Sequence, residues 1–224
     1  MAFSREFLIA FNMVNGIGPR RIAALVKMFG NLEKAWVAPY AELLKTPGIG
    51  PGLAQKIVEQ RRQIDPVKEE NWASTLGGRI VTLVDKAYPQ LLRNLPLAPP
   101  VLYIVGSLPI EPGIAVVGTR RPSRQGLRQA RLFSREFVRR GCCVISGLAR
   151  GIDHEAHTAA LSIGGKTTAV LGSNIGSIYP KEHVGLTRRI AENGALVSEF
   201  ASTHRTVPGN FPRRNRRIAA LSQS

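Results

Sequence analysis

The hydrophobic positions follow a helical spacing in the first third of the chain and an alternation of strands and helices afterwards. Residues 15–26 (NGIGPRRIAALV) and residues 47–58 (PGIGPGLAQKIV) both place G-I-G-P before an amphipathic helical pattern. Each copy predicts a helix, a tight glycine turn and a second helix that starts at Pro19 or Pro51, because proline suits the first helical turn.

Four glycines in these turns, Gly16, Gly18, Gly48 and Gly50, are expected to adopt backbone angles that a side chain would forbid. Such a turn presents backbone N–H groups at a helix N-terminus, where a phosphate can bind. The repeat resembles the paired helix-hairpin-helix motifs of sterile-alpha-motif-like (SAM-like) domains and predicts a small all-α domain over residues 1–70. The pattern leaves open whether this module contacts DNA or only packs.

A regular alternation of strands and helices begins near residue 113, beyond a boundary expected at residues 65–78. Two earlier apolar runs, 80–84 and 101–105, are β-like. The expected strands then cover 114–118, 142–146, 167–172 and 195–200, and the expected helices cover 126–141, 152–165, 183–194 and the chain from 215. Apolar strands joined by helices predict an extended Rossmann-like, doubly wound and mostly parallel α/β sheet within a second domain, 79–224.

Charge separates the same two segments. The chain carries 31 Lys and Arg against 15 Asp and Glu, a net charge of +16. Residues 1–78 hold 10 basic and 7 acidic side chains, residues 79–224 hold the other 21 and 8, and only three of those 21 are lysine. Because guanidinium groups make bidentate contacts with phosphates and stack on bases, this half favours a nucleic-acid partner.

Cysteine usage and hydropathy indicate the compartment. Cys142 and Cys143 are adjacent in the sequence, so they predict neither a disulfide framework nor a metal site and favour a reducing, cytoplasmic location. No apolar run is long enough to cross a bilayer, and no membrane partner is expected.

Small and basic residues follow three of the expected strands, in the segments GTRRPSRQG (118–126), SGLARGID (146–153) and GSNIGSIYPKEH (172–183). The candidate anion-binding residues are Thr119, Arg120, Arg121, Ser123 and Arg124 in the first segment, Ser146, Gly147 and Arg150 in the second, and Gly172 and Ser173 in the third. The carboxyl ends of parallel strands meet at one edge of a sheet, so these loops are expected to line one crevice.

The second of these loops is expected to offer free backbone N–H groups at Ser146, Gly147 and Gly151 to an anion. Asp153 is expected to act structurally, as a helix cap or as a salt-bridge partner of an arginine.

Two other motifs are tested and rejected. The histidines of HEAH (154–157) are three residues apart instead of four, and no cysteine or carboxylate cluster completes a site, so no metal is predicted and His157 is expected to pack in the core. GGKTT (164–168) has Ala160 where a P-loop needs glycine, and it leads from helix to strand. No set of catalytic residues assembles, so a binding protein without a cofactor is favoured over an enzyme.

Four segments in order, VVGTRRPSRQG, VISGLARGIDHEAHTAAL, AVLGSNIGSIYP and VPGNFPRRNRRIAALS, resemble the DNA-processing protein A (DprA/Smf) family. The resemblance implies a single-stranded DNA-binding protein of natural transformation, which protects incoming strands, helps to load the RecA recombinase and has no established catalytic activity. A homodimer is also expected for the family, although its contact lies in segments that family members carry beyond the point where this chain stops, Ser224.

Carried over onto this sequence, the resemblance implies a DNA groove that takes two residues from each loop: Arg120 and Ser123, Ser146 and Gly147, and Gly172 and Ser173. It also adds residues from the fourth segment. These are Phe211, Arg213, Asn215 and Arg216, beside the residues already given for the three loops. Arginines neutralise phosphates, and Phe211 can stack a base. The third family loop has glycine and aspartate where this chain has Asn174 and Gly176, so the details of the base pocket are expected to differ.

Two alternative functions stay open. The first is a nucleotide-processing hydrolase related to the lysine-decarboxylase-like Rossmann proteins, although PGNFP (208–212) lacks their P-G-G-x-G-T-x-x-E signature. The second places DNA on the N-terminal hairpins and makes the Rossmann-like half an interaction platform.

Overall fold

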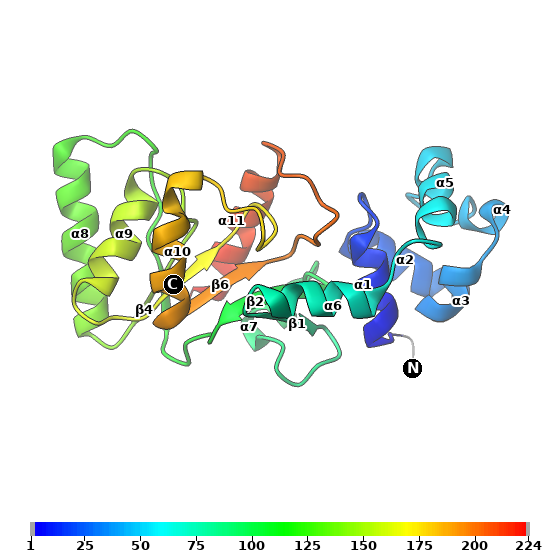
Figure 1. Ribbon diagram of the computed structural model, residues 1–224, viewed down its shortest axis with the longest axis horizontal. Helices are drawn as coiled ribbons and strands as arrows, with labels where there is room; N and C mark the ends of the chain where they lie inside the picture. Colours follow the sequence, from blue (N-terminus) through cyan, green and yellow to red (C-terminus); the bar gives the residue numbers. More distant parts are fainter. Residues whose placement is uncertain (1–2, 223–224) are drawn as a thin grey trace. The chain divides into compact units, whose positions relative to one another are not determined.

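A computed structural model describes residues 3–222 (Figure 1). The chain divides into two compact units. The first contains residues up to 75 together with 80–102 and 199–204, and the second contains 76–79, 103–198 and 205–224. The stretch in which a domain boundary was expected, 65–78, is largely helical, because α6 (Pro66–Thr75) occupies it.

The first unit is built from short helices. They are α1 (Arg5–Met13), α2 (Pro19–Phe29), α3 (Leu32–Val37), α4 (Tyr40–Leu43), α5 (Pro51–Gln60) and α6. Its fully buried side chains include Leu8, Phe11, Leu25, Leu32, Leu43 and Ile57. The ring of Phe11 meets that of Trp36 edge to face, with 4.9 Å between the ring centroids.

The two glycine turns have the expected helices but differ in detail from the prediction. Helices α2 and α5 begin at the expected prolines, each with a preceding glycine as N-cap. Gly16 and Gly48 have φ angles of 105° and 82°, which only glycine adopts easily. Gly18 and Gly50 instead have extended angles that any residue can adopt, so that part of the prediction is wrong.

Six strands form one mixed sheet. They are β1 (Gly78–Thr82), β2 (Val101–Gly106), β3 (Gly113–Ala115), β4 (Cys143–Ser146), β5 (Thr167–Val170) and β6 (Gly194–Ser198), and a short helix, α7 (Gln90–Arg93), lies between β1 and β2 in the chain. The spatial order is β1-β2-β6-β5-β4-β3. Strands β3 to β6 are parallel, whereas β2 runs antiparallel to β6 with Tyr103 opposite Ser198. The mostly parallel α/β sheet is therefore confirmed.

Four helices follow the strands of the second unit. They are α8 (Arg124–Arg139), α9 (Ile152–Leu161), α10 (Val184–Glu192), which a 3₁₀ turn η1 (Lys181–His183) precedes, and α11 (Asn210–Leu221). The first three lie side by side in Figure 1, as expected when successive right-handed crossovers step in one direction along a sheet.

Residues of β3 and β4 show that helices cover both faces of the sheet. Val144 packs with Ala156 and Ala160 of α9. On the opposite face, a Cβ built on Gly113 would lie only 2.7 Å from the carbonyl oxygen of Leu221 in α11. The glycine thus allows α11 to pack closely across β3.

Several element boundaries differ from the sequence prediction by a few residues, and two of the differences affect the site. Strand β3 ends at Ala115 instead of Gly118, so the following loop is longer. Helix α11 begins at Asn210 instead of Asn215, because a proline at position 212 is tolerated in the first helical turn. Phe211 and Arg213 therefore belong to a helix.

Within residues 3–222, no helix is both long and apolar enough to cross a membrane.

Candidate nucleic-acid interface

Three strand-end loops of the second unit and the start of α11 together form a small pocket that is partly open to solvent. Its lining residues are Arg120 from the loop after β3, Gly147, Ala149 and Arg150 from the loop after β4, Tyr179 and Pro180 from the loop after β5, and Phe211 and Arg214 from α11. The loops meet because β3, β4 and β5 are parallel neighbours and end at the same edge of the sheet.

Phe211 is at the centre of a cluster of aromatic and cationic groups. The Cζ atom of Arg120 lies 5.4 Å from the Phe211 ring centroid, within the range of a cation–π contact. The ring of Tyr179 lies 5.4 Å from the same centroid, tilted by 48°. On Gly172, a Cβ would be 2.6 Å from the Phe211 ring, so glycine is required beneath it. The pocket thus combines aromatic faces with positive charge.

Sequence reasoning missed Tyr179 and Arg214, which both line the pocket, and Arg214 has the more unusual environment. Its side chain is buried, and its Nη1 donates to the carbonyl oxygens of Gly147 and Val170, which follow β4 and end β5. It therefore connects β4 and β5 at the point where the backbone hydrogen bonds between the two strands end. Burial lowers the pKa of Arg214 to about 10, against the opposing effect of Asp153 and with a further lowering by Arg120. The group still carries its charge at neutral pH.

A signal for Arg214 exists in the sequence, but the predicted helix start concealed it. The buried positions of α11 are Asn210, Arg214, Arg217, Ile218 and Leu221, which is a helical spacing. With the helix started at Asn215, the first two of these positions fell outside the pattern.

The backbone of the loop after β4 is held by its own side chains. The Oδ2 atom of Asp153 accepts hydrogen bonds from the N–H groups of Gly147 at 3.1 Å and Ala149 at 3.3 Å. The carbonyl oxygen of Leu148, whose φ is 62°, is 2.9 Å from Nδ1 of His183. The expectation that the N–H of Gly147 is free is wrong, because a buried carboxylate uses it. The structural role expected for Asp153 fits this geometry.

The predicted serines also serve the loops. The buried hydroxyl of Ser146 donates to the carbonyl oxygen of Val116 at 2.6 Å. The hydroxyl of Ser123 accepts from the N–H of Gly126 at 3.1 Å and caps α8. Ser173 is buried, with its carbonyl oxygen accepting from the Ser198 hydroxyl at 2.7 Å. None of these three residues lines the pocket.

Arg150 lines the pocket and also forms an ion pair. Its Nε lies 2.5 Å from Oε1 of Glu182, and each side chain is about half exposed. The hydrogen bond lowers the pKa of Glu182 and raises that of Arg150. An anion entering the pocket therefore meets an arginine that has one acidic partner already.

The residues predicted on α11 are divided between two sides of the helix. Phe211 and Asn215 are four residues apart and lie on one side, where Asn215 Oδ1 accepts from Nε of Arg214 at 3.2 Å. Arg213 and Arg216 are exposed on another side and do not line the pocket. Asn215 is exposed too and does not line the pocket, so of the four predicted residues Phe211 alone lies in its lining.

The histidines behave as core residues. His157 is fully buried, 2.7 Å from the hydroxyl of Thr167, and burial lowers its pKa to about 3. In the part of the chain that the structure describes, no three His, Cys, Asp or Glu residues gather as a metal site would require. Cys143 is buried in β4 and Cys142 is partly buried just before it, and neither forms a disulfide.

Comparisons with known proteins agree with the two parts of the sequence prediction. Residues 79–224 match the model of the family "DNA recombination-mediator protein A", and residues 8–63 match that of the SAM-like helix-hairpin-helix tandem. Protein Smf of Synechocystis sp. is 37% identical over the whole of this chain, which spans 58% of that protein's length.

Two solved structures are also similar. DNA processing protein A from Streptococcus pneumoniae superposes with a TM-score of 0.75 at 28% identity, over 96% of this chain and 74% of that one. The Helicobacter pylori protein, solved for its single-stranded DNA binding mode, gives a TM-score of 0.57 at 31% identity over 64% of this chain and 66% of that one. With two thirds of its residues matched by the family model, the chain belongs to the DNA recombination-mediator protein A (DprA/Smf) family.

Proposed function

We propose that this chain binds single-stranded DNA through the strand-end pocket, protects incoming strands in natural transformation and helps to load the RecA recombinase. The observation that carries the proposal is the convergence of Arg120, Arg150 and Arg214 on one pocket beside Phe211 and Tyr179. Guanidinium groups neutralise phosphates, and aromatic rings stack on bases of any sequence. Binding is therefore expected to depend steeply on salt and little on base sequence.

The roles within the pocket differ. Arg120 is exposed and stacks on Phe211, so it is placed to contact a phosphate or a base. Arg214 is committed to two backbone carbonyls and positions the loops. All the predicted DNA-binding residues stay predictions: Arg120, Ser123, Ser146, Gly147, Arg150, Gly172, Ser173, Phe211, Arg213, Asn215 and Arg216. We expect the three serines to act through loop geometry.

The two alternatives from the sequence receive less support. Membership in a recombination-mediator family favours a binding protein over a nucleotide hydrolase. In the N-terminal hairpins, the guanidinium of Arg21 is occupied by the carbonyl oxygens of Gly16 and Gly48. The pocket remains the better candidate for the principal DNA contact.

Fluorescence anisotropy with labelled single- and double-stranded oligonucleotides at several salt concentrations tests the proposal. Single strands should bind more tightly, and Arg120→Ala should reduce the slope of log affinity against log salt by about 0.7, the value for one lost phosphate contact. Phe211→Ala should weaken binding with little change in slope, because a stacking contact releases no counterions. Equal binding of both variants and the wild-type chain would contradict the assignment of the pocket.

The recombinase role needs a separate assay. RecA adenosine triphosphatase activity on single strands coated with a single-strand-binding protein should rise when this chain is added. No rise, in a preparation that binds single strands, would limit the function to DNA binding.

A further inference from the structure

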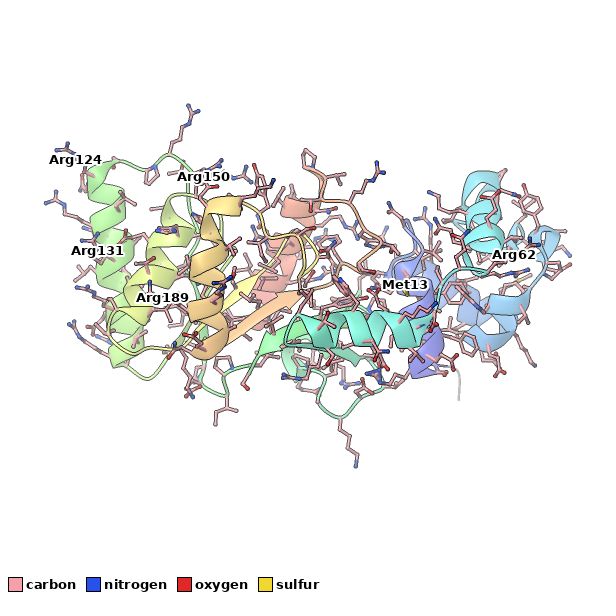
Figure 2. All side chains as sticks on the ribbon, viewed as in Figure 1. Met13, Arg62, Arg124, Arg131, Arg150 and Arg189 are labelled. Atoms are coloured by element: carbon pink, nitrogen blue, oxygen red, sulfur yellow. The ribbon has the colours of Figure 1, made fainter. Side chains whose placement is uncertain are left out.

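Helix α8 has a row of arginines that the pocket does not use. Arg124, Arg128, Arg131 and Arg135 are spaced by four, three and four residues, so they lie along one side of the helix, and we call them the α8 arginine stripe. Figure 2 shows Arg124 near the beginning of α8 and Arg131 farther along it.

Only the second half of the stripe has partners. Arg131 forms an ion pair with Glu155 at 2.7 Å, and Arg135 donates to the hydroxyl of Ser162 at 3.1 Å. Arg124 and Arg128 are exposed, and within residues 3–222 neither guanidinium has a hydrogen bond or ion pair. The uncompensated charge is therefore concentrated in the first two turns of α8.

This arrangement is unfavourable for the helix itself. Cations near a helix N-terminus oppose the helix dipole, and like charges four residues apart repel each other. No acidic residue lies in the first turn of α8. Side chains that reduce the stability of their own helix are expected where they bind something, so the stripe indicates an anionic ligand.

The stripe continues directly from the pocket. Arg120 lines the pocket, and Ser123, three residues later, caps α8. The start of this loop is held against α9, because the N–H of Ile152 donates to the carbonyl oxygen of Thr119, just before Arg120, at 3.2 Å. In Figure 2, Arg124 and Arg150 lie at the same end of the second unit. An anion that leaves the pocket on this side meets Arg124 first.

We infer that the α8 arginine stripe binds the phosphate backbone of single-stranded DNA beyond the nucleotides held in the pocket. Residues four apart on a helix are separated by a rise of about 6 Å, which is comparable with the distance between phosphates in an extended single strand. Continuity with the pocket favours a strand over an acidic protein. The inference rests on the proposed function and adds the path that the strand follows.

Length-dependent binding by the full chain tests the inference. The double variant Arg124→Gln/Arg128→Gln is compared with the matched control Arg188→Gln/Arg189→Gln, which removes the same charge from exposed positions of α10. Oligothymidylates of about 6 and about 18 nucleotides distinguish the pocket from the extended path. Anisotropy is measured between about 50 and 200 mM salt.

The α8 variant should bind the short strand like the wild-type chain and lose affinity for the long one. Its salt slope for the long strand should fall by about 1.4, so that its deficit relative to the wild-type chain shrinks about sevenfold across this salt range. The control should keep the wild-type slope within about 0.3.

Three results would overturn the inference. An α8 variant that binds both lengths like the wild-type chain removes the stripe from the path, while the pocket stands. Unchanged DNA binding with lost affinity for polyglutamate assigns the stripe to an acidic protein. No binding of either strand by the wild-type chain contradicts the proposed function itself, and the inference falls with it.

Discussion

Both units contain an arginine that ties two loops together through their carbonyl oxygens. In the first unit, Nε of Arg21 donates to Gly48 at 2.7 Å and Nη1 to Gly16 at 2.5 Å, which joins the two hairpin turns. In the second unit, Arg214 joins the ends of β4 and β5, with its Nη1 donating to both carbonyl oxygens. The guanidinium fork reaches two acceptors that no single backbone N–H could reach.

The two arginines differ in their exposure to water. Arg21 is partly exposed, so water can replace it at both carbonyls, whereas the side chain of Arg214 is only 4% exposed. Burial and the nearby charge of Arg120 together lower the pKa of Arg214. The second unit thus keeps a charged guanidinium group buried, which is energetically unfavourable. Titratable groups with perturbed pKa values of this kind are concentrated at binding sites. The comparison supports the pocket, and not the hairpins, as the functional centre.

The largest difference is expected between Arg214→Met and Arg21→Met. Loss of Arg214 leaves two buried carbonyl groups without a donor and should lower the free energy of unfolding by about 3 kcal/mol. Loss of Arg21 should cost less than about 1 kcal/mol, because water reaches the turns. Denaturant unfolding followed by circular dichroism measures both.

The control for this pair is Arg216→Met, at an exposed position of α11. Both tryptophans, Trp36 and Trp72, belong to the first unit, so their fluorescence reports that unit separately. If both substitutions lowered the free energy of unfolding equally, the burial of Arg214 would not make its contacts more stabilising than those of Arg21.

A second test uses the buried histidine of the second unit. Burial, and then the charge of Arg214, lowers the pKa of His157 to about 3, against an ordinary value of 6.5. Between these two pKa values the unfolded chain binds a proton that the folded chain does not. The free energy of unfolding is therefore unaffected by His157 above pH 6.5 and decreases as the pH falls below that value. At about pH 4 the loss from this group should be about 3 kcal/mol.

The matched variant is His157→Leu, which leaves the Thr167 hydroxyl donating to the carbonyl oxygen of Val144. Its stability should fall less steeply between pH 6.5 and 4, by about 1.4 kcal/mol per pH unit. Parallel pH profiles for variant and wild-type chains would exclude His157 as the source of acid sensitivity.

The smallest expected effects come from one substitution made in each unit. In Gly172→Ala the new methyl group would lie 2.6 Å from the Phe211 ring, so the ring must move, with a cost of about 1–2 kcal/mol and weaker DNA binding. In Gly52→Ala, within α5, nothing lies within 4 Å, and helix propensity should add about 0.5–1 kcal/mol of stability. Thermal unfolding measures whether each substitution raises or lowers the stability. A destabilised Gly52→Ala variant would contradict the finding that there is space for a methyl group at this position of α5.

Local pattern was sufficient for most of the fold. The helices that begin at Pro19 and Pro51, and the apolar strands around Val144 and Ala169, follow from spacing and turn chemistry within about ten residues of chain. The strand-end loops were also predictable, because parallel strands place their carboxyl ends together. The sequence by itself therefore determined the sheet, the hairpins and the edge of the sheet at which the pocket lies.

Only the tertiary structure decided what each group in those loops does. The motif PRRNRR contains four arginines that look equivalent in the sequence, yet Arg214 is buried while Arg213 and Arg216 face solvent. The N–H of Gly147 was expected to be free but is used by Asp153. The helical spacing of α11 indicates its buried side once the helix start is known. Which carbonyl oxygens Arg214 meets, and which N–H group finds a carboxylate, depends on packing between segments that are distant in the chain.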